Sequence, residues 1–223
     1  MKAGMRSGVG NVTWKVGTWA KHKGKLNMCH SGFHASVRAI DAMQYVNCEV
    51  LALVEARGKH LKQSDKQCWL EMRVVRAYRW EKPDSVAMAI YAAELVIGEY
   101  EKQYPDDKRP RQAIEAAKKW LDDPTEENRQ ASASASAYAS AAASASASAY
   151  AYAYAYASAY AAASASAYAA ASASAYAAAS AAASADAGDA AAYAASADAG
   201  DAAILDKVEK WIIERIKTLK EVS

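Results

Sequence analysis

The sequence WLEMRVVRAYRW at residues 69–80 is the clearest structural signal in the first part of the chain. Its β-branched and aromatic residues favour a strand. A second compact apolar run, CEVLALVEA, occupies residues 48–56. We expect the two runs to pair as central strands, and the polar residues 58–66 between them to form a loop. The second strand would then expose four charged side chains, namely Glu71, Arg73, Arg76 and Arg79.

Towards the N-terminus, the sequence continues in short segments separated by glycine. Residues 12–16 alternate apolar with polar side chains, which is the period of a half-buried strand. Residues 36–45 carry apolar side chains at helical spacing and predict a short helix. We therefore interpret residues 1–82 as a small, β-rich α+β module.

Towards the C-terminus, helical signals take over. Pro83 ends the strand, and Asp84 is placed to cap a helix over residues 86–104. A second helix is expected from Arg111 to Leu121, and a third after Asp123, which would be its capping residue. Residues 204–222 read as an amphipathic closing helix packed on the helices of residues 86–121.

Residues 131–203 are written almost entirely in Ala, Ser and Tyr. Their alternation favours strands or a silk-like stack, whereas alanine is the best helix former. We favour helix, because tyrosines recur at spacings of four and eight. The predicted fold class is α+β, in which the module of residues 1–82 precedes an all-α, alanine-rich helical bundle of residues 83–223.

Charge is distributed unevenly along the chain. Residues 1–82 carry 15 Lys and Arg against 6 Asp and Glu, whereas residues 83–223 carry 12 against 19. Such asymmetry indicates either that the halves attract each other or that the basic half meets an anion. The chain has three cysteines, and an odd number favours reduced thiols over a set of disulfides. No segment has the pattern of a signal peptide or of a membrane span. We expect a soluble protein of the cytoplasm.

The densest group of chemically active residues is CHSGFH at residues 29–34. Zinc binding would need a second ligand pair, which is missing, and nothing orients a histidine against Cys29 for nucleophilic catalysis. The simplest interpretation is a turn in which Phe33 packs inward. The same turn, with exposed backbone N–H groups, could still serve as an anion pocket. Its candidate ligand-binding residues are His30, Ser31 and His34.

Two other groups of candidate ligand-binding residues are basic. Arg73 and Arg76 lie among aromatic residues, a combination that nucleotide and single-strand surfaces use, although a solvated strand face explains them equally well. Lys108, Arg109 and Arg111 lie at the turn between the first two predicted helices. The alternative is that Arg109 and Arg111 form surface bridges to Asp106 or Glu115. No pattern indicates a catalytic set, a cofactor or a metal.

Residues 99–121, EYEKQYPDDKRPRQAIEAAKKWL, resemble the core of an immunity-protein family found beside bacterial toxins and in phages. In that family a similar segment precedes alanine-rich helices and a closing amphipathic helix, so the resemblance extends over residues 86–222. Separately, residues 17–35, which end in CHSGFHA, are similar to an uncharacterised N-terminal domain common in phage proteins. The resemblance implies a binding role in immunity.

Three functions follow as hypotheses. The first is a phage- or prophage-encoded, non-catalytic protein that neutralises a toxin or host-defence component by binding a protein or by sequestering an anionic nucleotide. The second is a nucleotide-acting enzyme, such as an ADP-ribosyl transferase-like domain that uses His30 or His34 with Glu49 or Glu55. The third is a structural protein whose Ala/Ser/Tyr face meets ice, carbohydrate or further copies in a homo-oligomer. We favour the first, because it fits the resemblance and needs no catalytic set.

Overall fold

The computed structural model describes residues 5–7, 12–43, 49–145 and 200–222. The chain divides into two compact units. The first comprises Met1–Glu81 and Glu209–Ser223, and the second comprises Lys82–Val208. Each unit contains a hydrophobic core of its own.

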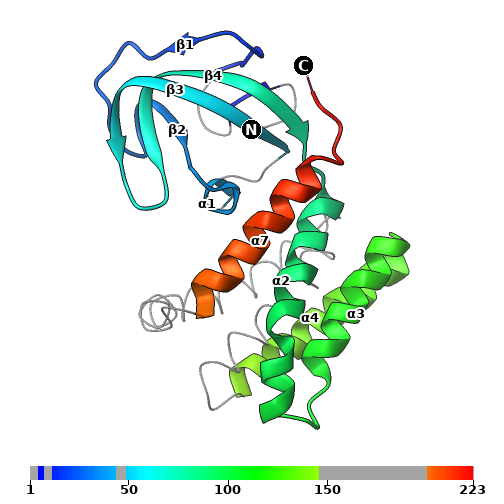
Figure 1. The fold of residues 1–223 in the computed structure, drawn as a ribbon. Helices are drawn as coiled ribbons and strands as arrows, with labels where there is room; N and C mark the ends of the chain where they lie inside the picture. The colour runs from blue at the N-terminus through cyan, green and yellow to red at the C-terminus, as the bar shows by residue number, and fades with distance from the viewer. Residues whose placement is uncertain (1–4, 8–11, 44–48, 146–199, 223) are drawn as a thin grey trace. The chain divides into compact units, whose positions relative to one another are not determined.

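An antiparallel four-stranded sheet forms the centre of the first unit (Figure 1). Strands β3 (Val50–Lys62) and β4 (Gln67–Arg79) make a long hairpin. The short strands β1 (Ala20–Lys21) and β2 (Phe33–Ala35) pair with the other edge of β4. The expected pairing of the two apolar runs is confirmed. Only β4 is central, however, because β3 pairs with β4 alone among the described strands.

Strand β3 continues into the segment that the sequence assigned to a loop. A bulge between Arg57 and His60 interrupts its pairing with β4, and Gly58 adopts a φ of 85°, which glycine does without steric cost. Beyond the bulge, the His60 ring stacks on Trp69 with 4.1 Å between ring centroids. The loop prediction was therefore wrong for residues 58–62, because cross-strand packing outweighs their polar sequence.

The core of the first unit lies against one face of this hairpin. Cross-strand pairs of inward residues, such as Val54 with Val74 and Ala56 with Met72, contribute to it. The end of the chain extends the same unit, because the Val222 N–H donates to the Ala77 carbonyl over 2.8 Å. The buried residues of this core are Met5, Trp14, Val50, Met72, Val74 and Ala77.

Residues 12–16 make isolated bridges instead of the expected strand. Thr13 bridges Arg6, and Val16 bridges Val74. Trp14 is buried, and its indole N–H donates to the Ser7 hydroxyl over 3.1 Å. The alternating pattern thus corresponds to the burial of Trp14, but these residues do not form the continuous hydrogen-bonded strand that we expected.

The short helix α1 (Ala39–Met43) lies inside the range predicted for it. The carboxylate of Glu209, from the C-terminal helix, accepts hydrogen bonds from the N–H groups of Ala39 and Ile40 over 2.8 and 2.9 Å. This contact satisfies donors that a helix N-terminus otherwise leaves unpaired.

Helices α2 (Lys82–Gln103) and α3 (Arg109–Asp122) form the core of the second unit (Figure 1). Helix α2 begins four residues before the predicted start, so Pro83 and Asp84 lie in its first turn. The predicted roles of these two residues as strand end and cap were wrong, because proline is well suited to a first helical turn. Core residues include Val86, Ile90, Ile97 and Tyr100 of α2 with Ile114, Ala117 and Trp120 of α3.

Helix α4 (Glu126–Ala145) follows, as predicted, but a different residue caps it. The Thr125 hydroxyl accepts a hydrogen bond from the Asn128 N–H over 3.3 Å, and the Asn128 amide donates to the Asp123 carbonyl over 2.7 Å. The same amide donates to the Asp123 carboxylate over 3.1 Å, so Asp123 contacts the first turn of α4 and Thr125 occupies the capping position. Small residues line the packed face of α4, where Ala139 meets Ala113 of α3.

Helix α7 (Gly200–Ile216) ends six residues before the predicted end of the closing helix, and Glu221 instead bridges Tyr78 of the sheet. Sheet and helices together confirm an α+β fold. Residues 146–199, which hold most of the Ala/Ser/Tyr tract, lie outside the described residues, so the all-α bundle remains a prediction. Among the described helices, none is long and apolar enough to cross a membrane.

Candidate functional site

The CHSGFH segment forms a tight turn that leads into β2. The N–H groups of His30 and Ser31 both donate to the Asn27 carbonyl, over 3.0 and 2.8 Å. The Cys29 N–H donates to His34 Nε2 over 2.9 Å, with Cys29 at a φ of 67°. These three N–H groups are therefore used within the turn, although the anion-pocket hypothesis needed them free.

Two histidines, His22 beside this turn and His34 within it, have structural partners. Ser31 Oγ lies 2.8 Å from His22 Nε2, and the two share a hydrogen bond. Burial lowers the pKa of His34 below its usual value of 6.5, a hydrogen bond with the Gly32 backbone opposes the shift, and Lys66 adds to it. The lowered pKa favours the neutral form of His34, which is the form that can accept a hydrogen bond from Cys29.

The histidines and glutamates of the transferase hypothesis do not come together. His34 pairs with Cys68 on one edge of β4, whereas Glu55 pairs with Arg73 on the other edge. These positions are five residues apart along β4, which corresponds to roughly 17 Å. Glu49 lies farther still, since it precedes Val50, the partner of Arg79. The arrangement does not provide the paired histidine and glutamate that this reaction would use.

Cysteines of the first unit also differ in environment. Cys29 is exposed and Cys68 is buried. Burial raises the pKa of the Cys68 thiol, which donates to the Ser31 carbonyl over 3.1 Å. Within the described part of the chain, no group of three His, Cys, Asp or Glu side chains could hold a metal ion.

Arg73 belongs to a compact group of charged side chains around Trp19. Its guanidinium lies 5.0 Å from the Trp19 ring centroid and pairs with Glu55 over 2.7 Å. The Arg57 guanidinium lies 4.0 Å above the same ring and pairs with Glu71 over 2.8 Å. We call this group the Trp19 platform; its members are Trp19, Lys21, Glu55, Arg57, Glu71 and Arg73.

Arg76 lies outside the Trp19 platform. It pairs with Leu53 across the hairpin, beyond a bulge between Leu53 and Val54. A hydrogen bond with Tyr78 raises the pKa of Arg76, as does the nearby Glu221. The structure therefore places the two predicted arginines of β4 in different surroundings.

Sequence reasoning missed the role of Arg57, although a signal for it exists. The tripeptides Glu55–Arg57 and Glu71–Arg73 both read Glu-x-Arg. In an antiparallel hairpin, two such tripeptides opposite each other pair each glutamate with the other's arginine, and the register does so here.

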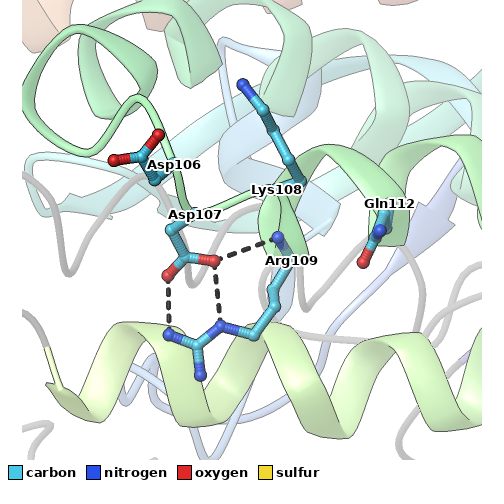
Figure 2. A pocket seen from close by; sticks show the side chains of 5 residues that line it. All are labelled: Asp106, Asp107, Lys108, Arg109 and Gln112. Carbon is cyan, nitrogen blue, oxygen red and sulfur yellow. Dashed lines mark hydrogen bonds and ion pairs between the residues drawn. The ribbon is translucent and has the colours of Figure 1, made fainter.

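In the second unit, Asp107 organises the turn between α2 and α3 (Figure 2). Its carboxylate accepts two hydrogen bonds from the Arg109 guanidinium, over 2.9 and 2.6 Å, and one from the Arg109 N–H over 3.0 Å. The buried Tyr100 hydroxyl donates to the same carboxylate over 2.7 Å. Arg109 holds the pKa of Asp107 well below its usual range.

Arg111 is also engaged within the unit. Its guanidinium forms a two-point pair with Glu101 of α2, over 2.8 and 2.6 Å, and holds the pKa of Glu101 below its usual value. A second pair, Lys118 with Glu94 over 2.8 Å, joins the same two helices. Arg109 and Arg111, which were predicted as ligand-binding residues, thus fix the turn and the α2–α3 contact.

An open pocket of about 540 Å³ lies at this turn. Lys108 is exposed, donates to the Pro105 carbonyl over 2.6 Å, and extends away from the Asp107–Arg109 pair (Figure 2). Gln112 is exposed as well. The lining residues are Asp106, Asp107, Lys108, Arg109 and Gln112.

Two consecutive segments of the chain match protein-family models. Residues 81–167 match the family described as "Imm-5 like putative immunity protein". Residues 1–83 match a domain of unknown function (DUF7666). These matches confirm the two resemblances noted from the motifs, the one to the immunity family over residues 81–167. No curated protein and no solved structure matches the chain.

Proposed function

We propose that the protein is a non-catalytic binding protein of the immunity type, which neutralises a toxin or host-defence component by binding it directly. In this proposal a phage or prophage encodes the protein, which acts in the host cytoplasm. The α2–α3 turn, residues 104–112, forms part of the surface that meets the partner protein.

The observation that carries the proposal is the prearranged turn inside the segment that matches the immunity family. Asp107 is held by Tyr100 and Arg109, so the backbone of the turn is fixed before any partner arrives. Fixed surfaces lose less conformational freedom on binding and therefore bind more tightly. The exposed side chains that this backbone presents are Asp106, Lys108 and Gln112.

A growth-protection assay tests this function. Each toxin gene beside the gene for this protein is induced in bacteria, with and without the full-length chain. We expect the chain to restore growth against one of these toxins. Lys108→Glu, which reverses a charge at the turn, should lower the protection at least tenfold, measured as the toxin induction that cells tolerate.

The matched control is Lys119→Glu, which makes the same charge reversal at an exposed position near the opposite end of α3. It should protect like the unchanged chain. Equal protection by the two variants would show that the turn is not part of the surface that contacts the toxin. Failure of the chain to protect against any neighbouring toxin would argue against the immunity role itself.

A further inference from the structure

The Trp19 platform includes a planar cation, the Arg57 guanidinium, on a side chain that is largely exposed to solvent. The Arg57 guanidinium lies 4.0 Å from the Trp19 ring centroid, yet the Arg57 side chain is 58% exposed. The Arg57 guanidinium therefore lies over the indole, while more than half of the Arg57 side chain remains open to solvent. Glu71 holds Arg57 in this position through a hydrogen bond of 2.8 Å.

A second cation lies beside this plane. The Lys21 ammonium is 3.3 Å from Glu71, and its side chain is 70% exposed. Hydrogen bonds from Arg57 and Lys21 hold the pKa of Glu71 below its usual value, so this carboxylate stays charged and keeps both cations in place. The platform thus places a guanidinium over an aromatic ring, with a second, exposed positive charge beside it.

We propose that the Trp19 platform binds a nucleotide, free or within a single strand, whose base stacks on the outer face of the Arg57 guanidinium and whose phosphate contacts Lys21. Bases stack well on aromatic rings and on guanidinium planes. An arginine already ordered by Trp19 and Glu71 loses little further freedom when a base stacks on it.

Charge in the first unit suits such a ligand. Residues 1–81 and 209–223 carry 18 Lys and Arg against 9 Asp and Glu, a formal charge of +9. A field of this sign concentrates anions near the surface and speeds their association. An acidic peptide would be attracted by the same field, but it has no base to stack on the guanidinium.

This binding site is independent of the proposed toxin contact, because it lies in the first unit and uses no residue of the α2–α3 turn. Loss of one activity would leave the other intact. A variant of the Trp19 platform should therefore still protect cells in the growth assay described above.

The test measures binding to the full-length chain by fluorescence anisotropy of a short labelled oligo(A) RNA and by calorimetry with ATP. We expect one or both to bind, and Arg57→Lys to weaken binding about tenfold, because lysine keeps the charge but lacks the plane. Binding of ATP would indicate a free nucleotide, and binding of the RNA alone would indicate a single strand.

Arg79→Lys is the matched control, since Arg79 is 55% exposed in the same hairpin and also has a glutamate partner, Glu81 at 3.8 Å. It should bind like the unchanged chain. Three results would overturn the proposal: no binding of either probe, equal effects of the two Arg→Lys substitutions, or equally tight binding of tripolyphosphate or polyglutamate.

Discussion

At the residue scale, Gly32 has less room for a side chain than the other described glycines of the first unit. A Cβ atom there would lie 2.5 Å from Cys68 Sγ and 2.6 Å from Leu26 Cδ2, and φ is 116°. Overpacking costs about 1–3 kcal/mol, and an unfavourable positive φ adds about 1 kcal/mol. We expect Gly32→Ala to lower the free energy of unfolding by about 2–4 kcal/mol, measured by urea denaturation.

Gly17 is the matched control for this prediction. It also has a positive φ, 77°, but a Cβ there meets no atom within 4 Å. Gly17→Ala should therefore lose only about 1 kcal/mol from backbone strain. Equal losses for the two variants would show that the close approach to Cys68 contributes nothing.

His34 links the stability of the first unit to pH. Because burial lowers its pKa below 6.5, the unfolded chain binds this proton more tightly than the folded chain does. The stability that neutral His34 contributes is therefore present above pH 6.5 and is lost as pH falls through the folded-state pKa. Between pH 7.5 and 5, the free energy of unfolding of His34→Gln should fall less than that of the unchanged chain. Parallel curves in denaturation at several pH values would contradict this assignment.

At the element scale, the packing of α4 on α3 depends on small side chains. Ala139 is fully buried against Ala113, whereas Ala137, two residues away, is exposed. Inserting bulk at the buried position should separate the helices, so Ala139→Leu should cost about 1–3 kcal/mol. Ala137→Leu should change the free energy of unfolding by less than about 0.5 kcal/mol. Thermal and urea unfolding of the two variants decide the matter, and equal stabilities would count against close packing.

Sequence alone predicted these elements where one local signal was strong. The apolar runs that became β3 and β4 and the starting region of α4 are such cases. The sequence-based prediction failed where a contact between distant residues determines the structure. His60 is an example, because it stacks on Trp69 and the strand continues past Gly58. Pro83 misled for a related reason, since a proline can end one element or begin the next.

For the candidate binding residues too, the sequence identified the residue types but not their distant partners. Residue type identified Arg73 and Arg111 as cations, but their roles depend on carboxylates elsewhere in the chain. Arg111 meets Glu101, ten residues away, and Arg73 meets Glu55 across the hairpin. Only the register of the strands and the pairing of the helices assign these partners, and neither is visible in composition.

At the scale of the whole molecule, the chain joins a basic unit to an acidic one. The second unit, Lys82–Val208, carries 9 Lys and Arg against 16 Asp and Glu, a formal charge of −7. Opposite charge gives the units different preferences for partners, since long-range attraction selects ligands of the other sign. This division agrees with a nucleotide site in the first unit and a toxin contact in the second, each proposed on its own geometry.

The most direct test of the immunity role is the complex itself. The purified full-length chain is mixed with the toxin from its own locus and analysed by size-exclusion chromatography with light scattering. We predict a single species with the mass of both proteins, formed by the Lys119→Glu variant and weakened in Lys108→Glu. Separate elution of the two unchanged proteins, at concentrations where the chain protects cells, would contradict direct neutralisation.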